Sequence, residues 1–301
     1  MSVVVIGEAL VDIVEQPGKA SSTTPGGSPL NVAVGLGRLG HAVELYAGIA
    51  DDANGAAVLR HIGASGVRLR NERPPARTAS AVATIQQDGS AHYEFDLAWD
   101  LPSVEVSPAT RFVHTGSLGA ALPPGDAAAL RALRAARRHA ITTFDPNVRP
   151  ALMRSHAQQL PLTEQFFAAS DVVKLSDEDA EWLYPRWTLD EVAERLLELG
   201  VAIVAITRGA DGAVLVTGKH RISLSTHVSE VVDTIGAGDT FMAGMIHALS
   251  EIVDTARLDR ADPLDAQSLS RVGSFAQSCA AITVSRRGAD LPWAREVFTG
   301  P

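Results

Sequence analysis

Short runs of β-branched and other apolar residues alternate along the chain with longer amphipathic or alanine-rich segments. This alternation predicts strands joined by crossover helices, and hence an α/β fold built on a mainly parallel sheet. Most of the predicted strands are apolar on both faces, which indicates that helices cover the sheet on each side. The predicted strands are 3–6, 43–47, 112–115, 141–144, 172–175, 203–206 and 213–216, and the predicted helices include 28–39, 124–139, 189–199 and 238–252.

One region, residues 78–99, departs from this alternation. Two strand-like runs flank Asp88 and Gly89, a dipeptide suited to a tight hairpin turn, so we expect an antiparallel insertion. The pattern alone leaves two interpretations open, an extension of the main sheet's edge or a lid over a ligand. No internal repeat, low-complexity tract or long linker sets the hairpin apart. We therefore expect it to belong to one domain that spans residues 1–301.

The composition narrows the classes of function. The chain has 301 residues, and its 35 acidic and 26 basic side chains give a formal charge of −9 with histidine neutral. This charge disfavours nucleic-acid binding, which draws most of its affinity from Lys and Arg contacts to phosphates. Hydrophobic residues make up 46% of the chain, enough for a large core and too many for an intrinsically disordered protein.

The single cysteine, Cys279, excludes an internal disulfide framework and a cysteine-based zinc cage, and it favours a reducing compartment. Residues 1–14 are mostly apolar, but they lack the positively charged start of a signal peptide and contain Glu8 and Asp12. We therefore expect neither a signal peptide nor a membrane span there. No other stretch approaches the length of a span. We therefore expect a cytoplasmic protein that does not bind membranes.

The most informative stretch is 231–244, in which Gly236 and Gly238 flank a turn. Beyond the turn, apolar residues recur at helical spacing, which predicts a helix that begins near Gly238. The free N–H groups and the positive dipole end of such a helix favour an anion such as a phosphate oxygen. Asp239 falls in the first helical turn, where two roles are open: a base, or an acid that only complements the helix dipole.

Two further glycines, Gly26 and Gly27, precede another predicted helix, with Ser28 as the expected N-cap and a proline at the first helical position. Capping alone would explain Ser28. The glycines also allow a ligand to approach the backbone closely, and Asn31 offers a donor and an acceptor to a polyhydroxylated ligand. Asp12 follows the first strand, near the sheet edge where open α/β sheets bind ligands, although an isolated acid there is more often part of a surface turn.

Residues 35–40 match the dinucleotide-binding pattern G-x-G-x-x-G, but their context is wrong for it. That pattern must follow a strand and open a helix. Here it ends the helix predicted from Ser28, with Gly40 just past the helix end, where glycine is common. We therefore expect no nicotinamide chemistry. The chain has no P-loop motif either, so a nucleotide phosphate would be held without one.

Three further stretches, 145–149, 174–179 and 207–212, follow predicted strands. Each has a simple structural interpretation: the acidic run in the second stretch begins a helix, and the third is a tight glycine turn. Taken with the Gly-Ala-Gly-Asp loop, they gather acids, an arginine and open backbone at one edge of the sheet. These are the groups that phosphoryl transfer requires.

Residues 26–40 and 233–241 together resemble the two signatures of the ribokinase-like (PfkB) sugar kinases, and within that family the sequence is most similar to bacterial fructokinases. The likeness extends over nearly the whole chain. It implies a single three-layer α/β domain with a small β-sheet lid over the sugar, formed by residues 9–25 and 78–100. It also implies ATP and Mg²⁺ as the phosphoryl donor.

The resemblance implies roles for individual residues. Asp239 would take the proton from the sugar hydroxyl, while Gly236, Ala237 and Gly238 would form the anion hole for the transferring phosphoryl group. The residues implied for the sugar are Asp12, Gly26, Gly27, Asn31 and Arg149. Those implied for ATP are Lys174, Ser176, Thr207, Arg208, Gly209, Gly212, Gly238 and Gln277, the last near the adenine.

Two departures from the family pattern concern metal ions. The family's N-x-x-E motif appears here as Ser176-x-x-Asp179, and we expect the shorter acid to reach Mg²⁺ through a water. Ile235 stands where one potassium-dependent relative has a threonine, so K⁺ would need a backbone carbonyl there. The potassium loop of such relatives corresponds to Asp233, Arg286 and Gly288.

We therefore expect an ATP-dependent kinase that phosphorylates a small sugar, D-fructose, at its 6-hydroxyl. Alternatives remain both within the family and in other classes of protein. Within the family, a 2-keto-3-deoxygluconate kinase would use Arg149 to pair with a sugar-acid carboxylate, and other sugar or nucleoside kinases are open. From other classes, a dehydrogenase or a non-catalytic sugar sensor remains; the sensor would need Asp12 and Asn31 but not Asp239. Apolar residues within 82–95 suit either a homodimer through the lid or a monomer.

Overall fold

A nine-stranded sheet forms the centre of the molecule. The computed structural model describes residues 1–16, 18, 20–71, 73–86, 91–97, 99–101, 103–226, 231–253, 258–259 and 261–298. The sheet order is β13-β12-β11-β10-β9-β8-β1-β4-β5, parallel except where β12 pairs with β11 and with β13. The strands are β1 (Ser2–Ile6), β4 (Ala42–Tyr46), β5 (Arg68–Arg70), β8 (Phe112–Gly116), β9 (Ile141–Asp145), β10 (Val172–Ser176), β11 (Ile203–Thr207), β12 (Ala213–Val216) and β13 (Arg221–Leu224).

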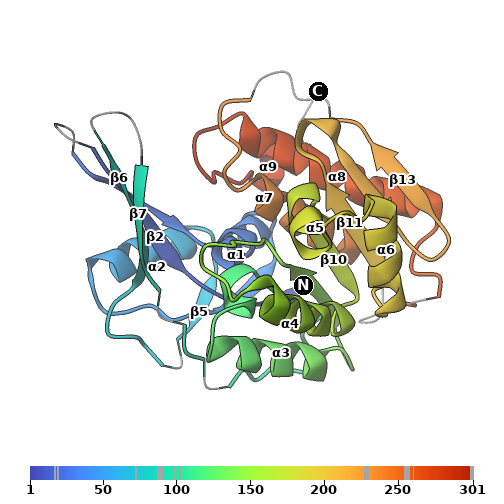
Figure 1. Ribbon diagram of the computed structural model, residues 1–301, viewed down its shortest axis with the longest axis horizontal. Coiled ribbons are helices and arrows are strands. Elements are labelled where there is room, and N and C mark those ends of the chain that lie inside the picture. The colour runs from blue at the N-terminus through green and yellow to red at the C-terminus, as the bar shows by residue number, and fades with distance from the viewer. Residues whose placement is uncertain are drawn as a thin grey trace.

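Helices cover both faces of this sheet, as the doubly apolar strands predicted (Figure 1). Along β1, Val3 and Val5 belong to one core cluster, and Val4 and Ile6 belong to the other, because successive side chains point to opposite faces. The first cluster lies under α1 (Ser28–Arg38), α2 (Ala53–Ala64), α7 (Ala237–Ile252) and α8 (Ala266–Val284). The second lies under α3 (Gly125–Ala136), α4 (His156–Ala168), α5 (Asp177–Leu183) and α6 (Leu189–Glu198).

The remaining elements are short. They are the 3₁₀ turns η1 (Ser117–Ala120) and η2 (Gly209–Asp211) and the helix α9 (Ala294–Phe298). Among the described residues, no helix combines the length and the apolar character needed to cross a membrane.

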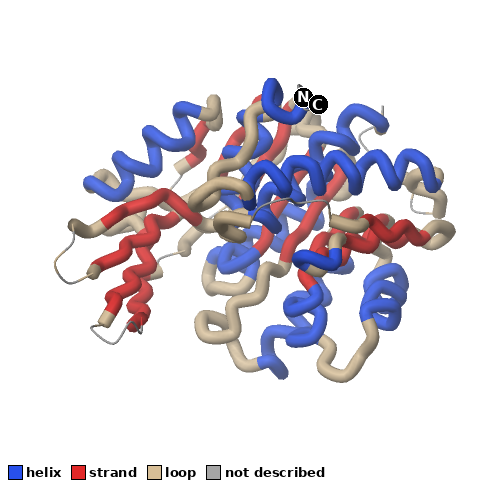
Figure 2. The backbone as a smooth tube through the Cα atoms, turned by 90° about the horizontal axis from the view of Figure 1, so that it is seen from above, coloured by secondary structure: helices blue, strands red, loops and turns tan. Residues whose placement is uncertain are grey.

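A separate four-stranded sheet projects from this body, at the left of Figures 1 and 2. Its order is β3-β2-β6-β7, with β2 and β6 parallel and the other pairs antiparallel. The insertion predicted at 78–99 therefore belongs to this second sheet and does not extend the edge of the main one. The proposed turn at Asp88 and Gly89 lies outside the described residues. The strands are β2 (Leu10–Glu15), β3 (Ser22–Gly26), β6 (Ala79–Ile85) and β7 (Ala91–Asp96).

The predicted strands and helices are all present, but the start of α1 differs from the prediction. Its N-cap is Gly27, whose φ of 108° is a backbone conformation that favours glycine, and Ser28 is already helical. The Ser28 hydroxyl does not cap the helix, because it donates a hydrogen bond to Asp239 instead. The other end is as predicted: Gly40, with a φ of 91°, lies just beyond the helix.

The glycines of the G-x-G-x-x-G stretch serve helix packing. A Cβ at Gly35 would lie 2.5 Å from the side chain of Leu291, and one at Gly37 would lie 2.2 Å from the carbonyl oxygen of Ser65. Both glycines are inside or at the end of α1 and not at its start. The stretch therefore ends a helix, as predicted, and does not open one.

The helix that carries Asp239, α7, is closely packed against α8 at Gly244. A Cβ added at Gly244 in α7 would lie 2.7 Å from the Cα of Ala276 in α8. Because the Cβ is fixed to the backbone of α7 and the Cα of Ala276 belongs to the backbone of α8, the contact can relax only if one helix moves.

We predict that Gly244→Ala lowers the free energy of unfolding by about 1–3 kcal/mol through overpacking. The matched control is Gly63→Ala in α2, an exposed position where an added Cβ meets nothing within 4 Å. That control should be neutral or stabilising by up to about 1 kcal/mol, because alanine favours helix more than glycine does. Urea unfolding of both variants measures the difference, and equal stability of the two would contradict the packing argument.

Candidate active site

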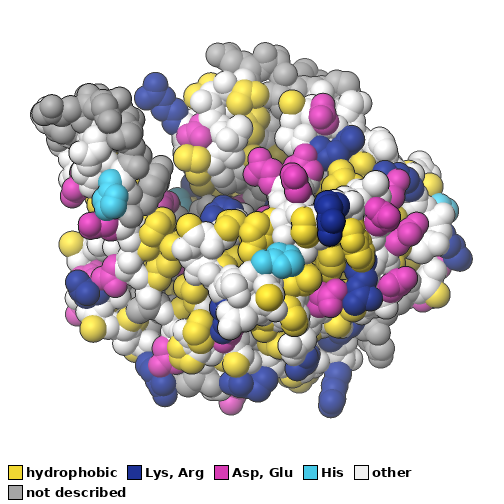
Figure 3. All heavy atoms as spheres, viewed as in Figure 1, with side chains coloured by type: hydrophobic (Ala, Val, Ile, Leu, Met, Phe, Trp, Pro, Cys, Tyr) yellow, Lys and Arg dark blue, Asp and Glu magenta, His cyan; other side chains and the backbone are white. Residues whose placement is uncertain are grey.

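The residues predicted around Asp239 lie where the carboxyl ends of the parallel strands meet the starts of α1 and α7. This is the edge at which open α/β sheets bind ligands. Figure 3 shows a hollow between the projecting small sheet and the helix-covered body. The strands β9, β10 and β11 end at Asp145, Ser176 and Thr207.

The carboxylate of Asp239 is held by two side chains from the start of α1. Its Oδ1 accepts a hydrogen bond from the Ser28 hydroxyl at 2.6 Å, and its Oδ2 accepts one from Asn31 Nδ2 at 2.8 Å. All three residues are buried, with Asp239 only 7% exposed. The two helix starts are therefore joined at this carboxylate, which fixes its orientation.

The turn before Asp239 leaves a helix N-terminus open to an anion. Gly236 is the N-cap of α7, with a φ of 77°, and its carbonyl oxygen accepts hydrogen bonds from the N–H and the hydroxyl of Thr240, both at 2.8 Å. The N–H of Ala237 donates to the carbonyl of Thr234 at 3.2 Å. The helix donors that remain for an anion therefore begin at Gly238.

A buried lysine lies against the same turn. Lys174 Nζ is 2.7 Å from Asp145 Oδ2, and both side chains are almost fully buried. A Cβ at Gly238 would lie 2.8 Å from Lys174 Nζ, so glycine there lets the ammonium group approach the helix start. Burial alone would lower the pKa of Lys174, but the surrounding carboxylates, led by Asp145, raise it above its usual value. The site therefore contains a fixed positive charge.

Asp179 is bound by backbone groups on two sides. Its Oδ1 accepts the N–H of Val148 at 2.7 Å, and its Oδ2 accepts the N–H of Ser176 at 2.9 Å, completing a capping box at the start of α5. The carboxylate thus ties the loop after β9 to the end of β10. Each oxygen keeps a further lone pair, so the contact of this carboxylate with Mg²⁺ through a water stays a prediction.

The residues expected to bind sugar form a continuous stretch beside Asp239, with one exception. A Cβ at Gly26 would lie 2.3 Å from Asp12 Oδ2, and one at Gly27 would lie 2.8 Å from the carbonyl oxygen of Glu8. Gly27, with its φ of 108° and a backbone atom against it, therefore requires glycine, whereas a larger residue at position 26 would have to displace the side chain of Asp12. The exception is Arg149, which is exposed and whose guanidinium donates to the carbonyl of Val148 at 2.9 Å.

Five of the eight expected nucleotide residues form a second group at the end of β11, while the other three, Lys174, Ser176 and Gly238, lie at the end of β10 or at the start of α7. Gly209 and Gly212 have φ values of 50° and 86° and shape the turn into β12. Gln277 Nε2 donates to Thr226 Oγ1 at 3.1 Å, and that hydroxyl donates to the carbonyl of Gly209 at 3.3 Å. Thr226 thus joins two predicted residues. Two other predicted residues lie in the same turn: Thr207 ends β11, and Arg208 donates to the carbonyl of Asp211 at 2.8 Å.

The structure brings together two of the three residues expected at the cation loop. Asp233 accepts hydrogen bonds from the N–H of Gly288 at 2.9 Å and the N–H of Ile235 at 3.0 Å, and these bonds hold its pKa below the usual value. The side chain of Arg286 instead pairs with Glu296 at 2.6 Å. A cation in this loop would therefore depend on carbonyl oxygens, as Ile235 already suggested.

Sequence reasoning missed the role of Glu8, which follows β1 at the same sheet edge. Glu8 is 6% exposed, and its Oε2 accepts the N–H of Gly119 at 2.7 Å. Burial raises the pKa of Glu8 to about 7, against the lowering effect of hydrogen bonds that include Gly119 and Ser117, and the nearby Asp239 raises it further. The position of Glu8 directly after a parallel strand is the signal that could have identified it.

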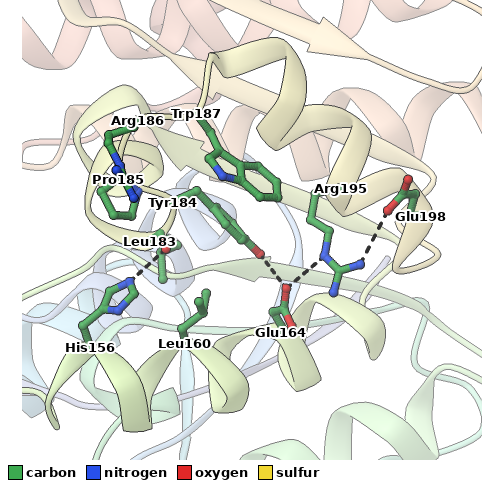
Figure 4. Close-up of a pocket in the computed structure, with 10 residues that line it drawn as sticks. All are labelled: His156, Leu160, Glu164, Leu183, Tyr184, Pro185, Arg186, Trp187, Arg195 and Glu198. Carbon is green, nitrogen blue, oxygen red and sulfur yellow. Dashed lines mark hydrogen bonds and ion pairs between the residues drawn. The ribbon is translucent and has the colours of Figure 1, made fainter.

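A separate surface pocket lies away from these residues, beyond the C-terminal end of α5 (Figure 4). Tyr184 stacks on Trp187 with ring centroids 5.0 Å apart, and its hydroxyl donates to Glu164 at 3.1 Å. Arg195 also bonds Glu164, at 3.0 Å. None of the residues that line this pocket is among the predicted site residues, so it is distinct from the site around Asp239.

We predict that Glu8→Gln changes how stability depends on pH. Because the folded-state pKa of Glu8 lies above its unfolded value, the wild-type free energy of unfolding decreases as pH rises from about 4.5 to about 7. Glutamine does not ionise and keeps an oxygen for Gly119. The variant should therefore gain stability relative to wild type across this range, by up to ~3 kcal/mol.

Thermal unfolding measured from acidic to mildly alkaline pH tests this, with Glu194→Gln, an exposed acid on α6, as the control. A wild-type-to-Gln difference that is the same at every pH would show that Glu8 does not titrate in this range.

The chain is similar to known proteins over most of its length. The family described as "pfkB family carbohydrate kinase" matches residues 1–295. The chain is 32% identical over 258 residues to a fructokinase of Rhizobium leguminosarum bv. trifolii, which covers 81% of this chain and 78% of the relative.

Two solved structures have the same fold over nearly their whole length. The fructokinase of Xylella fastidiosa with bound ATP matches with a TM-score of 0.84 at 25% identity, covering 99% of this chain and 97% of that one. The aminoimidazole riboside kinase of Salmonella enterica, complexed with aminoimidazole riboside and an ATP analogue, matches with a TM-score of 0.81 at 26% identity, covering 99% of each. The α/β architecture, the two glycine-rich helix starts and these matches agree: the chain belongs to the pfkB family of carbohydrate kinases.

Proposed function

We propose that this chain is an ATP-dependent fructokinase, which transfers the γ-phosphoryl group of Mg-ATP to the 6-hydroxyl of D-fructose. The observation that carries the proposal is the buried carboxylate of Asp239, oriented by Ser28 and Asn31 at an open helix N-terminus beside Lys174. A fixed base, an anion-binding helix start and a positive charge in one place are what phosphoryl transfer needs. The Rhizobium and Xylella relatives that are named fructokinases support the choice of acceptor.

In the proposed reaction Asp239 is the general base. The sugar hydroxyl gives its proton to a carboxylate oxygen of Asp239 while its oxygen bonds to the γ-phosphorus. The bond from that phosphorus to the β–γ bridging oxygen breaks, and ADP leaves. Such proton transfer contributes about 10²–10⁴ in rate, provided that the base is held in position. Ser28 and Asn31 do this by occupying one lone pair on each carboxylate oxygen.

The transferring group carries negative charge, which the start of α7 and Lys174 would stabilise. Gly236, Ala237 and Gly238 line the proposed anion hole, and its helix donors would be the N–H groups from Gly238 onward, because the N–H of Ala237 is bonded to Thr234. Lys174 remains charged because of the carboxylates around it. Its burial makes this charge more effective than one on the surface, since less water screens it.

Mg²⁺ would neutralise the ATP phosphates, and Asp179 is the proposed contact through a water. Among the described residues, no three His, Cys, Asp or Glu side chains are grouped to hold a metal. This suits a magnesium ion that is bound mainly by substrate phosphates and by one or two carboxylates. K⁺, if used, would bind the loop of Asp233, Arg286 and Gly288 through backbone carbonyls.

Nucleotide and sugar are proposed to bind on opposite sides of Asp239. The proposed ATP residues are Lys174, Ser176, Thr207, Arg208, Gly209, Gly212, Gly238 and Gln277, and the proposed sugar residues are Asp12, Gly26, Gly27, Asn31 and Arg149. The main alternative acceptor is a sugar acid such as 2-keto-3-deoxygluconate. The observation that favours it is the exposed guanidinium of Arg149, which donates to the carbonyls of Val148 and Asn147 in its own loop.

The chain is proposed to act as one domain, residues 1–301, with the small sheet and its connections, 9–25 and 78–100, as the lid. A lid would exclude water that otherwise competes with the sugar as acceptor.

The location proposed for the protein is the cytoplasm, and the free, buried thiol of Cys279 suits that reducing compartment. Val14 and Phe95 on the lid are 40% and 42% exposed, and a homodimer through them is part of the proposal, which sedimentation velocity tests.

We predict that Asp239→Asn lowers kcat at least about a hundredfold, because the base is lost while the side-chain shape is kept. ATP affinity, measured by calorimetry, should stay near the wild-type value. The matched control is Asp190→Asn, another acid in the first turn of a helix, exposed and remote from the site. Retained turnover in Asp239→Asn would remove Asp239 as the base.

We also predict the order of acceptors in an ADP-release assay with Mg-ATP. Fructose should give the highest kcat/KM, ahead of 2-keto-3-deoxygluconate, ribose, adenosine and aminoimidazole riboside. Arg149→Ala should leave the fructose value above all others if the ketose is the acceptor, and should selectively weaken a sugar acid if that is the acceptor. A sugar acid or a riboside ranking first would reject the fructokinase assignment but not the kinase.

A further inference from the structure

Gly119 is hydrogen-bonded through both of its backbone groups to segments that are far apart in the sequence. It lies in η1, directly after β8. Its N–H donates to Glu8 Oε2 at 2.7 Å, and its carbonyl accepts the indole N–H of Trp99 at 2.9 Å. Glu8 and Trp99 are 6% and 5% exposed. One buried residue therefore connects the end of β1 with the segment that follows β7.

The packing around this connection leaves little freedom. A Cβ at Gly119 would lie 2.6 Å from the Cα of Gly7 and 3.2 Å from Glu8 Oε2. A Cβ at Gly125, the first residue of α3, would lie 2.0 Å from Trp99 Nε1. The indole is thus enclosed between η1 and the start of α3, and it cannot shift without moving backbone.

The strands of the small sheet join the body of the molecule beside this connection. β2 begins at Leu10, just after Glu8, and β7 ends at Asp96, just before Trp99. β3 ends at Gly26, next to Gly27, which packs against the carbonyl of Glu8. Three of the four strands are therefore attached at one place.

The fourth strand has its own attachment. Thr78, immediately before β6, donates its N–H and its hydroxyl to the two oxygens of Asp52, at 2.9 and 2.8 Å. Asp52 in turn caps α2 through the N–H of Gly55. The small sheet is thus fixed at the base of every strand, and the attachment through Gly119 is the one adjacent to the site.

The same connection reaches the site through α1. Glu8 packs its carbonyl and Cγ against Gly27, the N-cap of α1, and the next residue, Ser28, holds Asp239. A displacement of Glu8 therefore moves the small sheet and the start of α1 together.

We propose that Glu8 and Trp99 are positioning residues that, by bonding to opposite sides of Gly119, set the small sheet at a fixed angle over Asp239. They act through Gly119 and the start of α1, not on the reacting atoms. The proposal deepens the proposed function, because the small sheet is taken to close over the sugar. Its expected signature is a weakened hold on the sugar with ATP binding preserved.

The test uses substitutions that remove one bond at a time. Trp99→Phe removes the indole N–H and keeps an aromatic ring, and Glu8→Ala removes the acceptor of Gly119. In each variant the KM for fructose should rise about tenfold, as expected for one buried hydrogen bond, while the KM for ATP stays unchanged. ATP hydrolysis in the absence of sugar should rise relative to phosphorylation, because water enters an incompletely closed site.

Two controls separate positioning from general destabilisation. Glu8→Gln keeps an oxygen for Gly119 and should recover most of the sugar affinity lost in Glu8→Ala. Trp187→Phe changes an exposed tryptophan in the separate pocket and should leave all parameters unchanged. The double variant Glu8→Ala/Trp99→Phe should be little worse than the poorer single variant, since both act through one residue. Fully additive effects, or equal losses for fructose and ATP, would overturn the proposal.

Hydrogen exchange provides a readout that does not need activity. In Trp99→Phe and Glu8→Ala, amides in β6 and β7 should exchange faster than in wild type, while those of β8 to β11 keep their protection. Unchanged exchange in β6 and β7 overturns the positioning role whatever the kinetics. If the wild-type protein phosphorylates no sugar, the proposed function fails, and the exchange result still decides this inference.

Discussion

The site depends on a close approach between two helices that begin at the same edge of the sheet. Ser28 and Asn31 reach Asp239 across 211 and 208 positions of sequence, which is possible only because α1 and α7 lie side by side. A Cβ at Gly35 in α1 would come within 3.0 Å of the Cβ of Ala243 in α7. Small residues at this contact bring the two helix starts, and with them the carboxylate and its two donors, into one place.

The charged groups that face the start of α7 are buried, and they do not follow the net charge of the chain. The chain carries a formal charge of −9, yet a cation, the buried ammonium of Lys174, lies against the start of α7 with carboxylates around it. A neutral sugar and a magnesium-neutralised nucleotide require no basic surface, so the surplus acids can remain solvated. The groups that would attract a phosphate are instead the ammonium of Lys174 and the start of α7, and burial reduces the screening of their interactions by water.

Much of the fold and part of the site could be predicted from the sequence. Strands apolar on both faces require helices on both sides, and this constraint predicted the main sheet and its helices. The carboxyl ends of its parallel strands indicated the edge where the candidate site lies. The role of Ser28 was misjudged, since a serine before a helix normally caps it. Here its hydroxyl meets a carboxylate from the far end of the chain, a partner that local pattern does not reveal.

The sequence by itself determined the layered α/β architecture, the helix that starts after Gly236 and the ending of α1 at Gly40, because backbone conformation and burial are encoded locally. Only the tertiary structure decided which polar groups meet. It assigned both oxygens of Asp179 to backbone N–H groups and turned Arg286 toward Glu296. It also placed Glu8 and Trp99 on opposite sides of Gly119. Such contacts join strands and loops distant in sequence, so they exist only once the sheet has been assembled.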